Sequence, residues 1–300
     1  LVTGVQTCAL PIYGTRHAIG LAAALDAGCF HHVSSIAAGG LYEGTWREDM
    51  FEEAENYDHP YFATKHDSEG IVREECKVPF RIYRPAIVVG DSKTGEIDKI
   101  DGIYYFFKSL QKLRNALPPW MPLIGIEGGK FNVVPVDYVV DAMDHIAHLP
   151  NLDGDCFHLT NPEHYSIGKL MNIMADAGHA PKFSMRLDMR VFNFIPRVAR
   201  DTLSSLPPIK RVTSTIMEDM GMPDSMTMFI NYPTRFDNRD TERALKGSGI
   251  SCPDLSDYAP IIWDYWERNL DPDLFIDHSL EGNVGGKIVD RKSTRLNSSH

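Results

Sequence analysis

VPFRIYRPAIVV, residues Val78–Val89, is the stretch that decides the fold, and Gly90 follows it directly. β-Branched and aromatic residues favour strands, so the stretch predicts one strand that ends at the glycine. Two shorter strands are predicted at Phe30–Ser35 (FHHVSS) and Cys156–Thr160 (CFHLT). The rest of the chain is organised around these three segments.

Helices are predicted between these strands from apolar residues at helical spacing. Pro60 opens one helix that runs to about Cys76, because proline suits the first turn. The other predicted helices cover residues 14–28, 102–117, 136–148, 166–177 and 257–269. Strands that alternate with helices predict βαβ units and a parallel sheet covered by helices, so the fold class is α/β.

The composition is that of a folded globular protein. The 300 residues are 43% apolar and 24% charged, which is ample for a buried core. The net charge of −11 argues against a nucleic-acid partner, which needs a basic surface. No apolar run reaches the roughly 18 residues that a membrane span requires. The five cysteines are scattered without paired spacing, which is typical of a protein in the reducing cytoplasm.

The two ends of the chain differ in character from the rest. Leu1–Ile12 (LVTGVQTCALPI) and Asp290–His300 (DRKSTRLNSSH) resemble in-frame translations of a sequencing adapter and its partner. We therefore expect that residues 1–12 and 290–300 are not native. The first four residues imitate the strand and turn of a Rossmann domain, but the next glycine after Gly4 is Gly14, so a G-x-G-x-x-G loop is missing here.

Tyr61 and Lys65 lie four residues apart near the start of the helix that Pro60 opens. At this spacing both side chains lie on one face of the helix. An ammonium beside a phenol stabilises the phenolate and makes the phenol a usable proton donor and acceptor near neutral pH. Taken alone, such a pair is more often an ordinary feature of a surface helix.

Four motifs in a fixed order are more specific than this pair. They are Val33-Ser34-Ser35 at the end of the first strand, the pair Tyr61 and Lys65, RPAIVVG at residues 84–90, and FNVVPVDYVV at residues 131–140. In this order the chain resembles the extended short-chain dehydrogenase/reductase family. The resemblance implies a Rossmann-like, doubly wound parallel sheet that lacks its first strands, with a smaller and mostly helical substrate or cap lobe.

The resemblance also implies the roles of single residues. Ser35, Tyr61 and Lys65 are the implied catalytic residues: Tyr61 gives a proton to the substrate oxygen, Ser35 hydrogen-bonds that oxygen, and Lys65 holds the nicotinamide ribose. The implied cofactor is NADPH, with NADH as the alternative, and no metal is implied. The residues implied to line the cofactor site are Tyr61, Lys65, Pro85, Ala86, Ile87 and Val88.

Within the family, the chain is most similar to fatty acyl-CoA and thioester reductases. The likeness is carried by DSKTGEID at residues 91–98 and by the Phe236-Asp237, Leu245 and Gly249 pattern. It implies a small acyl thioester substrate that hydride transfer reduces to an aldehyde. LEGNVGGKIV at residues 280–289 resembles the opening strand of a second reductase domain, as in the two-domain bacterial fatty acyl-CoA reductases.

The predicted organisation follows from these likenesses. Residues 13–180 form the later part of an NAD(P)-binding Rossmann domain, residues 181–280 form the substrate or cap region, and residues 281–289 begin a second domain. The family's glycine-rich turn would precede residue 13, and its helix Asn would fall at position 11, where the chain has Pro11. The 300-residue chain is therefore expected to bind NADPH weakly and to be inactive on its own.

Several alternatives remain open. A nucleotide-sugar epimerase or dehydratase and a hydroxysteroid-type dehydrogenase share the same motifs, whereas a non-catalytic dinucleotide-sensing module typically loses the Tyr or the Lys. Asp141, His145 and His148 have a spacing that suits a metal, although a solvated helix face is more common. Tyr104–Phe107 fits an acyl pocket or the core, and Arg186–Arg211 fits a membrane surface or a buried helix pair.

Overall fold

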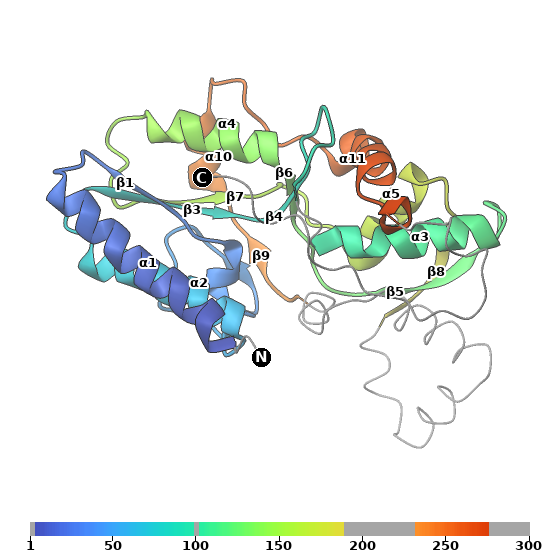
Figure 1. Ribbon diagram of the computed structural model, residues 1–300, viewed down its shortest axis with the longest axis horizontal. Helices are drawn as coiled ribbons and strands as arrows, with labels where there is room; N and C mark the ends of the chain where they lie inside the picture. The colour runs from blue at the N-terminus through green and yellow to red at the C-terminus, as the bar shows by residue number, and fades with distance from the viewer. Residues whose placement is uncertain (1–3, 99–101, 189–231, 276–300) are drawn as a thin grey trace, which may run out of the picture.

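The computed structural model describes residues 4–98, 102–188 and 232–275. This part of the chain folds into two lobes that lie side by side (Figure 1). The sheet lobe contains a three-stranded parallel sheet with helices on both faces, and the small lobe contains a two-stranded parallel sheet with three helices. The helices and strands of the sheet lobe are α1 (Gly4–Ala24), β1 (Phe30–Val33), α2 (Pro60–Glu75), β3 (Phe80–Pro85), α4 (Val136–Ala147), β7 (Cys156–Leu159) and α10 (Arg239–Leu245).

The sheet of this lobe has the strand order β1-β3-β7, and all pairs are parallel. Ile82 and Cys156 face α1 and α2, where they form one apolar cluster with Ile71 and Val72. The next residues along these strands point to the other face and pack against α4 (Figure 1). This alternation along each strand confirms the predicted α/β, doubly wound and Rossmann-like architecture.

The small lobe is assembled from three separate stretches of the chain. Its elements are α3 (Tyr105–Ala116), β5 (Leu123–Glu127), α5 (Ile167–Ala177), β8 (Phe183–Asp188) and α11 (Leu255–Asn269). Aromatic rings fill the space between the helices, and Phe107 stacks on Trp263 with 4.9 Å between ring centroids. Tyr104 and Phe107 are almost fully buried in this cluster, so the aromatic run at residues 104–107 contributes to a core.

Short elements connect the lobes. β4 (Ile87–Val89) pairs with β6 (Val133–Pro135), and β2 (Thr45–Trp46) pairs with β9 (Arg235–Phe236), each in parallel. β9 runs between the two lobes (Figure 1). Three 3-10 helices complete the described elements: η1 (Ile36–Gly39), η2 (Gly102–Tyr104) and η4 (Pro272–Phe275).

The predicted strand at residues 78–89 is two strands in the structure, and Ala86 separates them. The Ala86 N–H still donates to the Leu159 carbonyl of β7, but the Ile87 N–H donates to the Asn132 carbonyl beside β6. The prediction of one strand was wrong because composition shows strand propensity and not which neighbour each backbone group pairs with.

The first helix begins at Gly4 and not at Gly14, so it includes most of the adapter-like stretch. Pro11 lies inside this helix, and the Thr15 hydroxyl donates to the Pro11 carbonyl at 2.8 Å. Of the predicted cap region, residues 181–188 and 232–275 are described. Most of the stretch at residues 186–211, and residues 281–289 and 290–300, lie outside the described residues.

A buried ion pair joins α2 to the sheet. The Arg84 guanidinium donates to both carboxylate oxygens of Glu69, at 3.0 Å from Nε and 2.6 Å from Nη2, and both side chains are fully buried. Arg73 and the Ser34 hydroxyl also donate to Glu69, at 2.9 and 2.8 Å. Burial by itself would raise the pKa of Glu69, but the charges of Arg84 and Arg73 and these hydrogen bonds outweigh it and hold the pKa at about 2.

The network continues from Arg84 to β7. Arg84 donates to His158 Nε2 at 3.1 Å, so the His158 proton is on Nδ1, which donates to the Asp237 carbonyl at 2.7 Å. Glu48 ends the network, because its carboxylate accepts from the His158 N–H and from the first turn of α10. Burial raises the pKa of Glu48 to about 7, and these hydrogen bonds limit the rise. The acidic stretch at residues 48–56, predicted as a solvated loop, therefore contains a buried carboxylate.

Glu69→Gln should lower the free energy of unfolding by about 3–5 kcal/mol at pH 7, because it leaves Arg84 buried without its counter-charge. The folded-state pKa of Glu69, about 2, lies below the ordinary value of 4.5. The contribution of this carboxylate is therefore complete above pH 4.5 and is lost as the pH falls towards 2. Denaturant unfolding at pH 7 and pH 3 measures both effects, and the variant should lose less stability than the wild type over this interval.

Glu75→Gln is the matched control on the same helix. Glu75 also pairs with an arginine, Arg16, at 3.0 Å, but the side chains of both are more than two-fifths exposed. An exposed pair of this kind contributes about 0–1 kcal/mol. Equal losses of stability in the two variants would contradict the structural role assigned to Glu69.

Candidate functional site

The candidate site lies at the carboxyl ends of the parallel strands. Val33 of β1 pairs with Tyr83 of β3, and the Ser34 N–H donates to the Tyr83 carbonyl at 2.8 Å. Ser35 and Pro85 therefore leave the sheet at the same edge. In open α/β sheets this edge is where ligands bind.

Ser35 is the first residue of the turn that leads away from β1. It caps η1, and its hydroxyl accepts from the Ala37 N–H at 3.2 Å. The side chain is 8% exposed. Gly40 ends the turn in a left-handed conformation (φ +63°), and the Tyr232 hydroxyl donates to the Gly40 carbonyl at 2.7 Å. The position of the Ser35 hydroxyl is thus fixed from both ends of a short segment.

Tyr61 and Lys65 are one turn apart at the start of α2, as the spacing predicts. The His59 side chain caps this helix by accepting from the Tyr61 N–H at 3.3 Å. The Tyr61 side chain is 47% exposed, so its hydroxyl is open to a ligand. The ring of His66, on the same helix, hydrogen-bonds the Ala38 carbonyl of η1 at 3.0 Å. Ser35 and Tyr61 therefore sit on two elements in direct contact, although no hydrogen bond joins their hydroxyls.

Lys65 lines a cleft of about 310 Å³ between α1, β1 and α2. Burial lowers the pKa of Lys65, and its ammonium has no hydrogen bond or ion pair within the described part of the chain. Ser68, 3% exposed, also lines the cleft, and its hydroxyl has no partner among the described residues. Burial lowers the pKa of His32 to about 4, so this third polar group of the cleft is neutral at pH 7.

The four other predicted cofactor residues do not line this cleft. Pro85 ends β3, and Ala86 follows it, both buried. Ile87 is half-buried in β4, and Val88 is 37% exposed. The structure thus brings them to the same sheet edge as Ser35, while Lys65 faces the neighbouring cleft.

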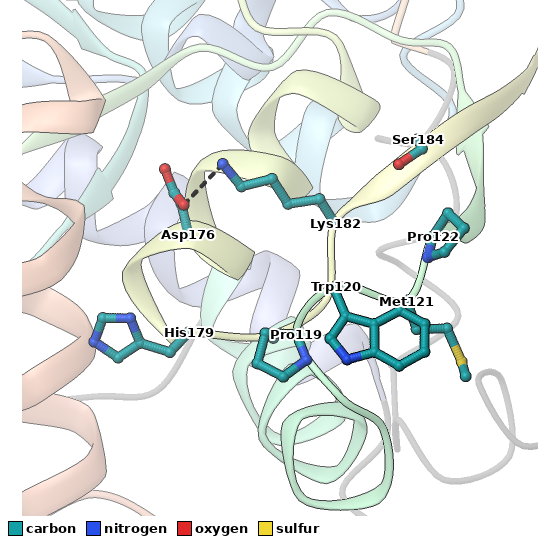
Figure 2. Close-up of a pocket in the computed structure, with 9 residues that line it drawn as sticks. Pro119, Trp120, Met121, Pro122, Asp176, His179, Lys182 and Ser184 are labelled. Carbon is teal, nitrogen blue, oxygen red and sulfur yellow. Dashed lines mark ion pairs between the residues drawn. The ribbon is translucent and has the colours of Figure 1, made fainter.

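A larger cavity, of about 400 Å³, lies in the small lobe at the end of α5 (Figure 2). Trp120, 79% exposed, forms one side, and an ion pair between Asp176 and Lys182 (2.8 Å) forms another (Figure 2). None of the predicted site residues lines this cavity. Asp141 and His148, considered for a metal, are exposed on α4, and the described residues contain no group of three or more side chains that could hold a metal ion.

Sequence reasoning missed the residues that position the site. Glu69 lies one turn beyond Lys65 and two turns beyond Tyr61, and it binds the Ser34 hydroxyl next to Ser35. The available signal was an acidic residue in the same i, i+4 row as Tyr61 and Lys65. That signal is weak, because such a residue is ordinarily solvated.

Comparisons with known proteins agree with this geometry. The model of a protein family described as Male sterility protein matches residues 6–143. The non-canonical nonribosomal peptide synthetase hkm10 of Aspergillus hancockii is 28% identical over 255 residues, which are 81% of this chain and 24% of that protein. The chain therefore spans about a quarter of the length of this curated relative.

Two solved structures have a similar fold. The terminal R domain from the myxalamid PKS-NRPS biosynthetic pathway gives a TM-score of 0.54 at 24% identity, over 80% of this chain and 58% of that one. The UDP-glucuronic acid 4-epimerase from Bacillus cereus, in complex with NAD, gives 0.54 at 14% identity, over 85% of this chain and 66% of that one. At these identities the likeness concerns the fold.

Gly40→Ala should lower the free energy of unfolding by about 2 kcal/mol or more, since an added Cβ would lie 2.1 Å from the Glu55 carbonyl oxygen at a positive φ. Gly20→Ala in α1 is the control, because its Cβ would meet open space within a helix. That change should be neutral or stabilise by up to about 1 kcal/mol. Thermal unfolding measures both, and a harmless Gly40→Ala would show that the turn after Ser35 is not constrained as described.

Proposed function

The chain belongs to the extended short-chain dehydrogenase/reductase family, and on that premise we propose that it is an NAD(P)H-dependent reductase domain that converts an acyl thioester to an aldehyde. The observation that carries the proposal is the arrangement of Tyr61 and Lys65 on α2 against the turn that holds Ser35, at the carboxyl edge of the sheet. Both Tyr61 and Lys65 are present, which argues against a module that has lost catalysis.

The relatives favour a thioester over a sugar. A nonribosomal peptide synthetase and a terminal R domain are similar to this chain at 28% and 24% identity, whereas the UDP-glucuronic acid epimerase is similar at 14%. The chain ends of such synthetases are held as thioesters on carrier domains, and a thioester carbonyl can accept a hydride. The nucleotide-sugar epimerase remains the competing function that an experiment must separate.

The polar groups of the cleft suit the nicotinamide half of a dinucleotide. A half-buried ammonium without an acceptor and a buried hydroxyl without a partner are costly unless a ligand satisfies them, and a ribose supplies hydroxyls to both. We propose that Lys65 binds these ribose hydroxyls and that Pro85, Ala86, Ile87 and Val88 line the nicotinamide. NADPH is the proposed cofactor and NADH the alternative. When bound, the cofactor supplies the hydride.

The residues of the chain then manage one proton and one oxygen. As a C–H bond forms at the thioester carbonyl carbon, the oxygen gains negative charge, and the Tyr61 phenol donates its proton to it. The Ser35 hydroxyl donates a hydrogen bond to the same oxygen. The tetrahedral product then loses its C–S bond: the hydroxyl proton is released, the carbonyl reforms as an aldehyde, and the sulfur leaves as a thiolate that takes up a proton.

We also propose a larger setting for the domain. The curated relative is about four times longer than the matched region, and residues 280–289 resemble the start of a second reductase domain. The parent protein is therefore proposed to be a multidomain enzyme of the cytoplasm. Cys29, Cys76, Cys156 and Cys252 are free thiols, which supports a reducing compartment. None of the described helices is long and apolar enough to cross a membrane.

Tyr61→Phe in the parent protein should lower turnover by about 10²–10⁴-fold, the usual contribution of a positioned proton donor. The affinity for NADPH should stay nearly unchanged, because the phenol hydroxyl is removed without loss of the ring. Lys65→Ala should weaken both cofactor binding and turnover. NADPH consumption with acyl thioesters and with UDP-sugars, beside cofactor titrations of each variant, provides the measurement.

Lys112→Ala is a control for loss of a lysine on a helix, since Lys112 lies on α3 in the other lobe. It should behave as the wild type. Turnover of UDP-sugars without turnover of thioesters would overturn the substrate assignment. Full activity of Tyr61→Phe would overturn the mechanism, whatever the substrate.

A further inference from the structure

Residues 232–236 cross from the candidate site into the space between the lobes. Tyr232 is buried against the site: its hydroxyl bonds the Gly40 carbonyl, and its ring lies 6.2 Å from the ring of Phe62, the neighbour of Tyr61. Arg235 follows three residues later, in β9. An extended segment of that length spans about 10 Å. Arg235 thus lies within a short reach of the Tyr61 hydroxyl without being part of the catalytic group.

Two cations and one imidazole are held on this segment. The Lys130 ammonium donates to the Pro233 carbonyl at 2.9 Å. The Arg235 backbone N–H donates to the Gly44 carbonyl at 2.8 Å, which leaves its exposed guanidinium directed by a fixed backbone. His164 Nε2 accepts from the Phe236 N–H at 2.9 Å, so its proton is on Nδ1.

The field around these residues is positive. Burial, followed by the charges of Arg235 and Lys130, lowers the pKa of His164 to about 4. The nearest acidic residues in sequence are already paired: Glu163 with Lys169 at 2.7 Å, and Asp237 with Arg239 at 2.7 Å. Within the described part of the chain, Arg235 has no ion pair. A neutral imidazole beside a guanidinium without a carboxylate partner leaves room for an anion.

We propose that Arg235, with Lys130, binds the phosphate of a phosphopantetheine arm that carries the thioester to Tyr61. The inference rests on the proposed function, because a thioester substrate is what brings such an arm to this site. Guanidinium and ammonium groups are the side chains that proteins use to bind phosphate. The phosphate lies at the far end of the arm from the sulfur, which matches a basic pair set back from the reacting carbonyl.

The same chemistry is available from two sources. A free acyl-coenzyme A and an acyl group on a carrier domain both present a phosphopantetheine arm. Pantetheine without its phosphate is a matched probe, because it keeps the thiol and the amides and lacks only the charge. UDP is the probe for the competing nucleotide-sugar function, whose ligand also carries phosphate.

The first experiment uses the 300-residue chain, with 4′-phosphopantetheine, pantetheine and UDP as the titrants in calorimetry. Phosphopantetheine should bind about tenfold more tightly than pantetheine, as expected for one charge-assisted contact, and UDP should not compete with it. Arg235→Ala should remove the difference, and Arg235→Lys should restore most of it. Raising the salt concentration should reduce the advantage of the phosphate.

Arg239→Ala is the control, because Arg239 is an exposed arginine four residues away that is paired with Asp237. It should leave the tenfold difference in place. Equal binding of the two arms by the wild type, binding of UDP in place of phosphopantetheine, or an unchanged difference in Arg235→Ala would each overturn the proposal. Because the Arg235 side chain is exposed, these variants should fold, and thermal unfolding checks this.

A second experiment separates this proposal from the proposed function. In the parent protein, Arg235→Ala should raise KM about tenfold for acyl-phosphopantetheine and leave kcat and the KM for acyl-pantetheine unchanged. A rise for both acyl-coenzyme A and carrier-bound substrate supports the shared arm, and a rise for one of them identifies the source. Thioester turnover with no change in KM would overturn only the phosphate site. Phosphopantetheine binding without turnover of any thioester would overturn the reductase function and leave the phosphate site standing.

Discussion

The arrangement of the site depends on one buried carboxylate. Glu69 pairs with Arg84 at the end of β3 and accepts the Ser34 hydroxyl at the end of β1, so α2 has one register against the sheet. A buried ion pair of this kind adds little net stability over an apolar pair of the same shape, but it is costly to break. Its effect here is specificity of position. Tyr61, Lys65 and Glu69 lie in one i, i+4 row, and fixing the last of them fixes the other two.

How much of this was predictable differs between elements. The helices at residues 60–75, 136–147 and 255–269 were predicted within about two residues at each end, because their apolar spacing and their caps are local signals. The parallel pairing of β5 with β8, sixty residues apart in the chain, has no local signal and was not foreseen. The same holds for Glu69 and Arg84, since a charged residue shows its partner only after the fold has brought them together. Glu48 was interpreted as solvated for that reason.

The small lobe shows a second limit of reasoning along the chain. Its core joins α3, α5 and α11, which are separated by more than fifty residues each, around the stacked rings of Phe107 and Trp263. The rings of residues 104–107 had no visible partner in the sequence, so a pocket and a core were equally compatible with them. Packing decides such cases, because an aromatic face is buried wherever a complementary face reaches it. The roles of Ser35, Tyr61 and Lys65 came from a resemblance, and the structure adds their neighbours.

The proton chemistry of these three residues does not select a substrate. A phenol and a hydroxyl at a carbonyl oxygen serve hydride transfer to a thioester as well as hydride transfer from a sugar. Selection must come from groups that hold the rest of the molecule, and binding energy far from the reacting carbon is suited to this task. Residues 232–236 meet that requirement: Tyr232 contacts the turn after Ser35, and Arg235 faces the space between the lobes. Because this segment shares no hydrogen bond with Glu69, the charge that it offers to a substrate can change while the catalytic residues keep their places.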